Sequence, residues 1–163
     1  MTTANYAPPD LRKLSSGELV ALGEKSLREH ILAQAVVAHH KYAPFTFEKL
    51  DPFLQDPECV RYPTRLVFEF GDMAMHQFGQ PDVDYRNPDR SGRVLYLRPI
   101  LLNRPDLVVL AVAYMVPVIN YGDIIADEHC LSYGASLLGL MEEEFYAQIC
   151  GAADFVGAEH RMS

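Results

Sequence analysis

The chain has 163 residues, the usual length of one domain, and a composition of 49% hydrophobic and 22% charged residues is ordinary for a globular protein. Its formal net charge of −8 disfavours nucleic acid as a partner. The three cysteines are scattered and form no Cys-x-x-Cys pair, which argues against a disulfide framework or a thiolate zinc site. These features predict a cytoplasmic protein in a reducing compartment.

Residues 1–14 are polar, contain a Pro-Pro pair and carry neither the basic nor the apolar region of a secretory signal, so they predict a flexible N-terminal arm. Residues 15–163 are expected to form a single helical domain. Ser16 is a suitable N-cap for a first helix that continues to about Lys41. The helical spacing of four apolar residues predicts its core face: Leu27, Ile31, Ala35 and Ala38.

The middle of the chain predicts a second helix over residues 64–78, closed by Gly79. The preceding residues, 45–63, are punctuated by prolines and are expected to form a connection with a short helical turn. Residues 80–93 are rich in Asp, Asn and Pro and predict a long polar loop. The apolar residues 94–97 predict a short strand or an extended crossover.

A third helix is expected to begin at Pro105 and Asp106 and to continue to about Ala126, with a kink at Pro117. Its most apolar part, residues 107–119, is too short to span a bilayer and predicts a buried core helix, so no membrane partner is expected. Gly139 should end another helical piece. A last helix over residues 141–156 carries three glutamates in its first turn, where the helix dipole favours acids.

Together these elements predict an all-α fold with a four-helix core and a long connection between the second and third helices. Ferritin-like bundles have this order, although a distinct helical array fits the pattern almost as well. The analogy concerns the fold alone and says nothing about function.

Two segments of the chain resemble each other, residues 67–76 and residues 118–127. Each reads apolar, apolar, polar, aromatic, Gly, Asp, three apolar, polar. In a helix the polar members would share one stripe. The first stripe would hold Glu69, Asp72 and His76, and the second Asn120, Asp123 and Asp127.

If the two helices crossed at Gly71 and Gly122, the stripes would face each other and form a metal site for Fe, Mn or Zn. The predicted ligands are Glu69, Asp72, His76, Asp123, Asp127 and His39. The site would suit an oxidoreductase, but it lacks the Glu-x-x-His pairs of di-iron bundles. The competing interpretation is that the first stripe is an ordinary solvent-facing surface and that Asp123 caps a helix after a break at Gly122.

The charge is distributed unevenly. Between Pro105 and His160 there is no Lys or Arg but nine acids, whereas five arginines lie within residues 86–104. Either the arginines fold against the acidic half, or the acidic half attracts a cation or a basic partner. The alternative function is therefore a non-catalytic accessory or assembly protein, which binds a basic protein or forms a homo-oligomer.

Overall fold

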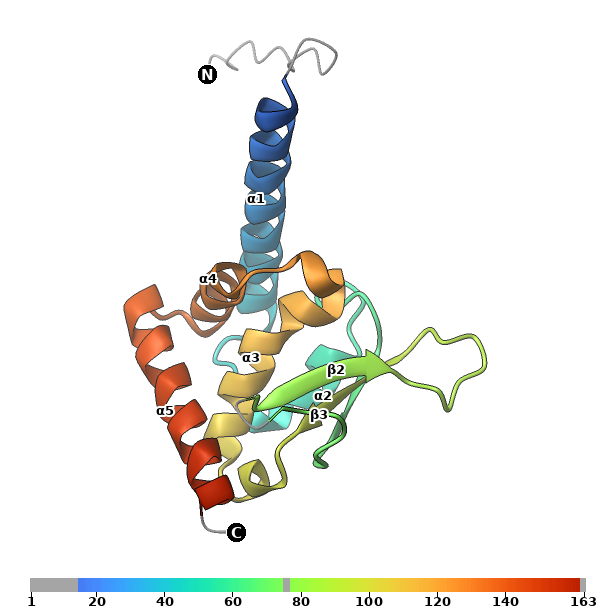
Figure 1. Ribbon diagram of the computed structural model, residues 1–163, viewed down its shortest axis with the longest axis vertical. Coiled ribbons are helices and arrows are strands. Elements are labelled where there is room, and N and C mark those ends of the chain that lie inside the picture. The colour runs from blue at the N-terminus through green and yellow to red at the C-terminus, as the bar shows by residue number, and fades with distance from the viewer. Residues whose placement is uncertain (1–14, 75–76, 162–163) are drawn as a thin grey trace.

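The computed structural model describes residues 15–74 and 77–161 (Figure 1). Within these residues the chain forms five α-helices and a three-stranded sheet. The helices and strands in chain order are α1 (Ser16–Tyr42), α2 (Leu50–Leu54), β1 (Thr64–Val67), β2 (Gly79–Val83), β3 (Arg93–Leu97), α3 (Pro105–Tyr121), α4 (Asp127–Leu138) and α5 (Glu142–Arg161). Three short 3-10 turns connect them: η2 (Phe47–Lys49), η3 (Pro99–Asn103) and η4 (Gly122–Ile124).

Helix α3 lies at the centre of the molecule, between the sheet, α4 and α5 (Figure 1). It begins at Pro105, as predicted, and its buried side chains form the middle of the core. The segment Pro105–Ile124 is long and apolar enough to cross a membrane, but 61% of its apolar window is buried inside the protein. The prediction of a core helix is therefore confirmed.

Helix α1 packs its C-terminal half against α4, while its N-terminal half projects away from the body (Figure 1). The N-cap is Ser15 rather than Ser16, and its side chain accepts a hydrogen bond from the Glu18 amide at 3.1 Å. Ile31, Ala35 and Ala38 are buried, so the predicted core face is correct.

The all-α prediction is wrong, because residues predicted to be helical form part of a sheet. Strand β3 is its centre; it pairs in parallel with β1 and antiparallel with β2. The second predicted helix, residues 64–78, does not form: its first residues are β1, and Gly79, predicted to close the helix, begins β2. Residues 80–93 are not one long loop, because β2 continues to Val83. The four-helix core and the ferritin-like order therefore do not hold.

The residues in and after β1 explain why a strand forms here in place of the predicted helix. The segment that follows Pro63 is rich in β-branched and aromatic side chains, which favour a strand. Gly71 then takes a positive φ of 53°, where the ring of Tyr96 would lie 3.2 Å from an added Cβ. Leu95 and Leu97 of β3 are fully buried in the hydrophobic core. Burial of the apolar sheet face, which only non-local pairing provides, overrides the helical periodicity.

The prediction that two continuous helices cross at Gly122 is also wrong, because nothing lies within 4 Å of a Cβ added there. Gly122 is the C-cap of α3, with φ 69°, and the chain continues into η4 and then α4. The alternative that the helix breaks at Gly122 is confirmed, although Asp123 lies in η4 and the N-cap of α4 is Ala126. Gly139 ends α4 in a left-handed conformation, as predicted.

Candidate functional site: an apolar groove beside helix α5

The structure separates the residues of the predicted metal site. Glu69 and Asp72 are exposed in the turn after β1, and His76 lies outside the described residues. His39, in the last turn of α1, donates from Nδ1 to the carbonyl oxygen of Leu137 at 2.9 Å. The helical stripe proposed for Glu69, Asp72 and His76 cannot form, because residues 64–67 are a strand and Gly71 ends the extended segment in a turn.

Asp123 and Asp127 are brought together at one cavity of about 550 Å³ between β2, α3 and the start of α4. Asp127 accepts a hydrogen bond from the Tyr114 hydroxyl at 2.7 Å. Burial, and then this hydrogen bond, raises the pKa of Tyr114. Glu69, Asp72 and His39 do not line this cavity. Within residues 15–74 and 77–158, no three His, Cys, Asp or Glu side chains gather closely enough to hold a metal ion.

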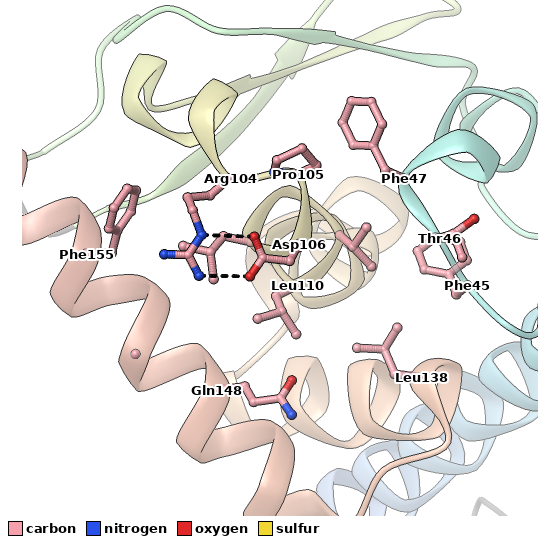
Figure 2. A pocket seen from close by; sticks show the side chains of 13 residues that line it. Phe45, Thr46, Phe47, Arg104, Pro105, Asp106, Leu110, Leu138, Gln148 and Phe155 are labelled. Carbon is pink, nitrogen blue, oxygen red and sulfur yellow. Dashed lines mark hydrogen bonds and ion pairs between the residues drawn. The ribbon is translucent and has the colours of Figure 1, made fainter.

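A different site has the size and chemistry of a binding surface. It is an open cavity of about 610 Å³ between η2, the start of α3, the end of α4 and α5, which we call the apolar groove (Figure 2). Its lining is predominantly hydrophobic. The residues that line it are Phe45, Thr46, Phe47, Arg104, Pro105, Asp106, Leu107, Val109, Leu110, Leu138, Gln148, Gly151 and Phe155.

The two sides of the apolar groove are formed by the segment at Phe45 and by helix α5. On one side, the Phe45 ring packs edge-on against the buried Phe53, with the ring centroids 4.9 Å apart. On the other side, Gln148, Gly151 and Phe155 follow one stripe of α5, at i, i+3 and i+7. Figure 2 shows Phe45 and Phe47 on one side of the cavity and Phe155 on the other. No atom lies within 4 Å of a Cβ added at Gly151, so the groove is open beside this glycine.

The charges that line the apolar groove neutralise each other. Arg104 makes a bidentate pair with Asp106, at 2.9 Å from Nη2 to Oδ2 and 3.1 Å from Nε to Oδ1. This interaction lowers the pKa of Asp106. The Arg104 guanidinium also lies 5.3 Å from the centroid of the Phe155 ring, a cation–π distance. The positive charge of Arg104 is therefore already paired with Asp106 and Phe155 of the same chain.

The α5 side of the apolar groove carries exposed carboxylates. Glu144 lies four residues before Gln148 on the stripe of α5 that lines the groove, and Asp154 lies three residues after Gly151. Both side chains are exposed, and neither has an ion-pair partner among the described residues. In that part of the chain, the only ion pair that joins the Arg-rich and acidic segments is Arg104–Asp106. Most of the negative charge after Pro105 therefore faces solvent.

The described cysteines do not provide a nucleophile for the apolar groove, because none of them lines it. Burial raises the pKa of the Cys59 thiol to about 11 and that of Cys130 to about 12, so both stay protonated at neutral pH. Thr46 and Gln148, the neutral polar residues of the lining, can donate and accept hydrogen bonds. The lining therefore offers both hydrophobic surface and hydrogen-bonding groups to a bound molecule.

Sequence reasoning missed the apolar groove because its lining comes from four separate stretches of the chain. The available signal was the Gln148-x-x-Gly151-x-x-x-Phe155 stripe, which places a glycine between two large side chains on a surface helix. Comparisons with protein-family models, curated proteins and solved structures found no match to this chain.

Proposed function

We propose that this protein is a non-catalytic accessory or assembly protein, and that its apolar groove binds a segment of a partner protein. The segment would insert an aromatic or large aliphatic side chain between Phe45 and Phe155 and would carry basic residues on either side. The observation that carries the proposal is an open hydrophobic cavity whose own cation is already paired, beside unpaired carboxylates on α5.

The size and hydrophobic lining of the groove support the insertion of an aromatic or large aliphatic side chain of the partner. A cavity of about 610 Å³ has room for a large side chain and part of its backbone. Buried aromatic anchors contribute much of the binding free energy at protein interfaces. Phe47 is 43% exposed, which leaves apolar area at the rim for a partner to cover.

The carboxylates of α5 support the proposal that basic residues lie on either side of the inserted side chain. Glu144 and Asp154 lie near opposite ends of the Gln148–Phe155 stripe, so a segment lying along α5 would meet a carboxylate at each end. Opposite charges at an interface accelerate association and fix the orientation of the bound segment. Because both carboxylates are exposed, this contribution should weaken as salt is added.

The chain contains no tryptophan, so a tryptophan-containing peptide reports its own binding by fluorescence. We expect a Lys-Lys-Trp-Lys-Lys peptide to bind saturably, with the blue shift of an indole that leaves water. Gly151→Leu should weaken this binding at least about tenfold, because the new side chain occupies the groove, and about 1.4 kcal/mol corresponds to tenfold.

Gly157→Leu is the matched control. Gly157 also lies on α5 with open space around its Cα but does not line the apolar groove. Leucine is a better helix former than glycine at both positions, so neither variant should lose stability. The proposal is wrong if Gly151→Leu binds the peptide as well as Gly157→Leu does. If a Glu-Glu-Trp-Glu-Glu peptide bound as tightly as the Lys-flanked peptide, the proposal that the partner segment is basic would be wrong. If N-acetyl-tryptophanamide bound as tightly as the Lys-flanked peptide, the groove would be a pocket for small molecules.

A further inference from the structure

A second open cavity, of about 600 Å³, lies between the segment before β1, two strands of the sheet and the end of α3. Four charged side chains line it, those of Arg61, Arg93, Asp82 and Asp123, and we call it the charged cavity. Within the described residues no ion pair includes any of these four, whereas three other arginines each pair with an aspartate. The charged cavity therefore offers unpaired groups of both signs to a ligand.

The two arginines of the charged cavity gather on one aromatic ring. The centroid of the Tyr62 ring lies 3.8 Å from Cζ of Arg93 and 5.4 Å from Cζ of Arg61, so the two Cζ atoms are separated by no more than the sum of these distances. Nη1 of Arg93 donates to the carbonyl oxygens of Arg90 and Gly92. Its Nε and Nη2 have no acceptor in the described part of the chain and are available to an anion.

A buried asparagine fixes the backbone that carries Arg61. Asn120, near the end of α3, is 3% exposed and lines the charged cavity. Its Oδ1 accepts a hydrogen bond from the Arg61 amide at 2.8 Å, and its Nδ2 donates to the carbonyl oxygen of Cys59 at 3.3 Å. The segment before β1 is thus tied to α3. An amide nitrogen carries two hydrogens, so Nδ2 has a second donor for a bound molecule.

Positive and negative groups lie toward different ends of the charged cavity. Arg61 also lines a neighbouring cavity of about 280 Å³ beside α1, whereas Asp123 also lines the cavity of about 550 Å³ beside β2. These two neighbours have no lining residue in common, so they adjoin the charged cavity at different places. In the sheet, Arg93 belongs to the central strand and Asp82 to the edge strand β2. The lining therefore changes from basic to acidic along the cavity.

We propose that the charged cavity binds a small molecule with a phosphate monoester at one end and a protonated amine at the other. A phosphate monoester carries a charge of about −1.5 to −2 at neutral pH and has three acceptor oxygens. It can therefore bond to two guanidiniums at once, which a carboxylate with one charge and two oxygens does less well. The amine would bind the carboxylates of Asp82 and Asp123.

The proposal is independent of the proposed function, because the charged cavity and the apolar groove have no residue in common. The Trp peptide and a phosphorylated amine test the two sites separately, so failure of one experiment leaves the other result unchanged.

Calorimetric titration of the full chain with aminoalkyl phosphates, from aminoethyl to aminohexyl phosphate, tests the ligand class. We expect at least one of them to bind with a Kd below about 1 mM, and more tightly than the alkyl phosphate of the same length. Arg61→Gln should weaken this binding at least about tenfold, because charge-assisted hydrogen bonds are lost. Arg28→Gln, at an exposed arginine of α1 that does not line the charged cavity, changes the net charge equally and should bind as the wild type does.

Asp123→Asn tests the acidic end. It should remove the advantage of the aminoalkyl phosphate over the alkyl phosphate and leave the affinity for the alkyl phosphate undiminished. The proposal is overturned if no aminoalkyl phosphate binds, or if Arg61→Gln binds the probe as tightly as Arg28→Gln does. Equal affinity for the amino acid of the same length, with a carboxylate in place of the phosphate, would also overturn it.

Discussion

Replacing Gly134 by alanine is expected to destabilise the protein by roughly 2 kcal/mol. Gly134 is buried in α4 where α5 crosses it, and a Cβ there would lie 2.2 Å from Cζ and 2.4 Å from Cε2 of Phe145. The Phe145 ring is fully buried, so it has no space into which to move. The collision therefore outweighs the gain of about 1 kcal/mol that alanine brings to a helix. Denaturant unfolding monitored by circular dichroism measures the change.

Two comparisons show whether the collision is the cause. Gly151→Ala, on a helix position with open space, should be neutral or more stable by up to about 1 kcal/mol. In a Phe145→Leu background the ring is absent, and Gly134→Ala should then cost much less than in the wild-type chain. If Gly134→Ala were as stable as the wild type, the close packing of α4 on α5 would be wrong.

Asp56→Asn is expected to lower the free energy of unfolding at neutral pH by about 1–3 kcal/mol and to change its dependence on acid. One Asp56 oxygen accepts hydrogen bonds from Lys41 Nζ and from the Tyr42 hydroxyl, each at 2.6 Å. The other accepts from the Glu58 amide at 3.0 Å. These contacts join the end of α1 to the segment after α2, so their loss loosens the base of α1.

The sign of the pH effect follows from the pKa. The hydrogen bond from Lys41, followed by that from Tyr42, lowers the pKa of Asp56 from 3.8 to about 2. Because the folded pKa lies below the ordinary value, the ionised carboxylate stabilises the fold above pH 3.8, and this contribution is lost as the pH falls toward 2. The stability of Asp56→Asn should therefore decline less over that interval.

Acid titration of the unfolding free energy measures the difference. Asp51→Asn is the control, since Asp51 is an exposed carboxylate of α2 without an ion pair in the described part of the chain. Its acid dependence should match that of the wild type. An Asp56→Asn variant with the wild-type slope between pH 3.8 and 2 would contradict the proposed linkage.

The residues that carry the proposed function belong to no recognisable sequence motif. Phe45, Leu138 and Phe155 are ordinary hydrophobic residues, and Arg104 and Asp106 form an ordinary ion pair. They make a candidate site only because the fold places them around one open cavity. The Gly-Asp segments, by contrast, contain the residue types of a metal site, but the fold keeps Asp72 in the turn after β1 and Asp123 in η4.

The sequence by itself predicted α1, the start of α3, the end of α4 and most of α5, because caps, prolines and glycines act on the backbone within a few residues. Ser15, Pro105 and Gly139 each act in this local way. Only the tertiary structure decided that residues 64–67 form a strand, since the pairing of β1 with β3 joins residues 29 apart in the register Thr64 to Arg93. The same holds for the apolar groove, whose walls meet through burial of α3 in the core. Burial depends on the whole chain, so a local pattern such as the stripe from Gln148 to Phe155 shows one wall of the groove but not the residues that face it.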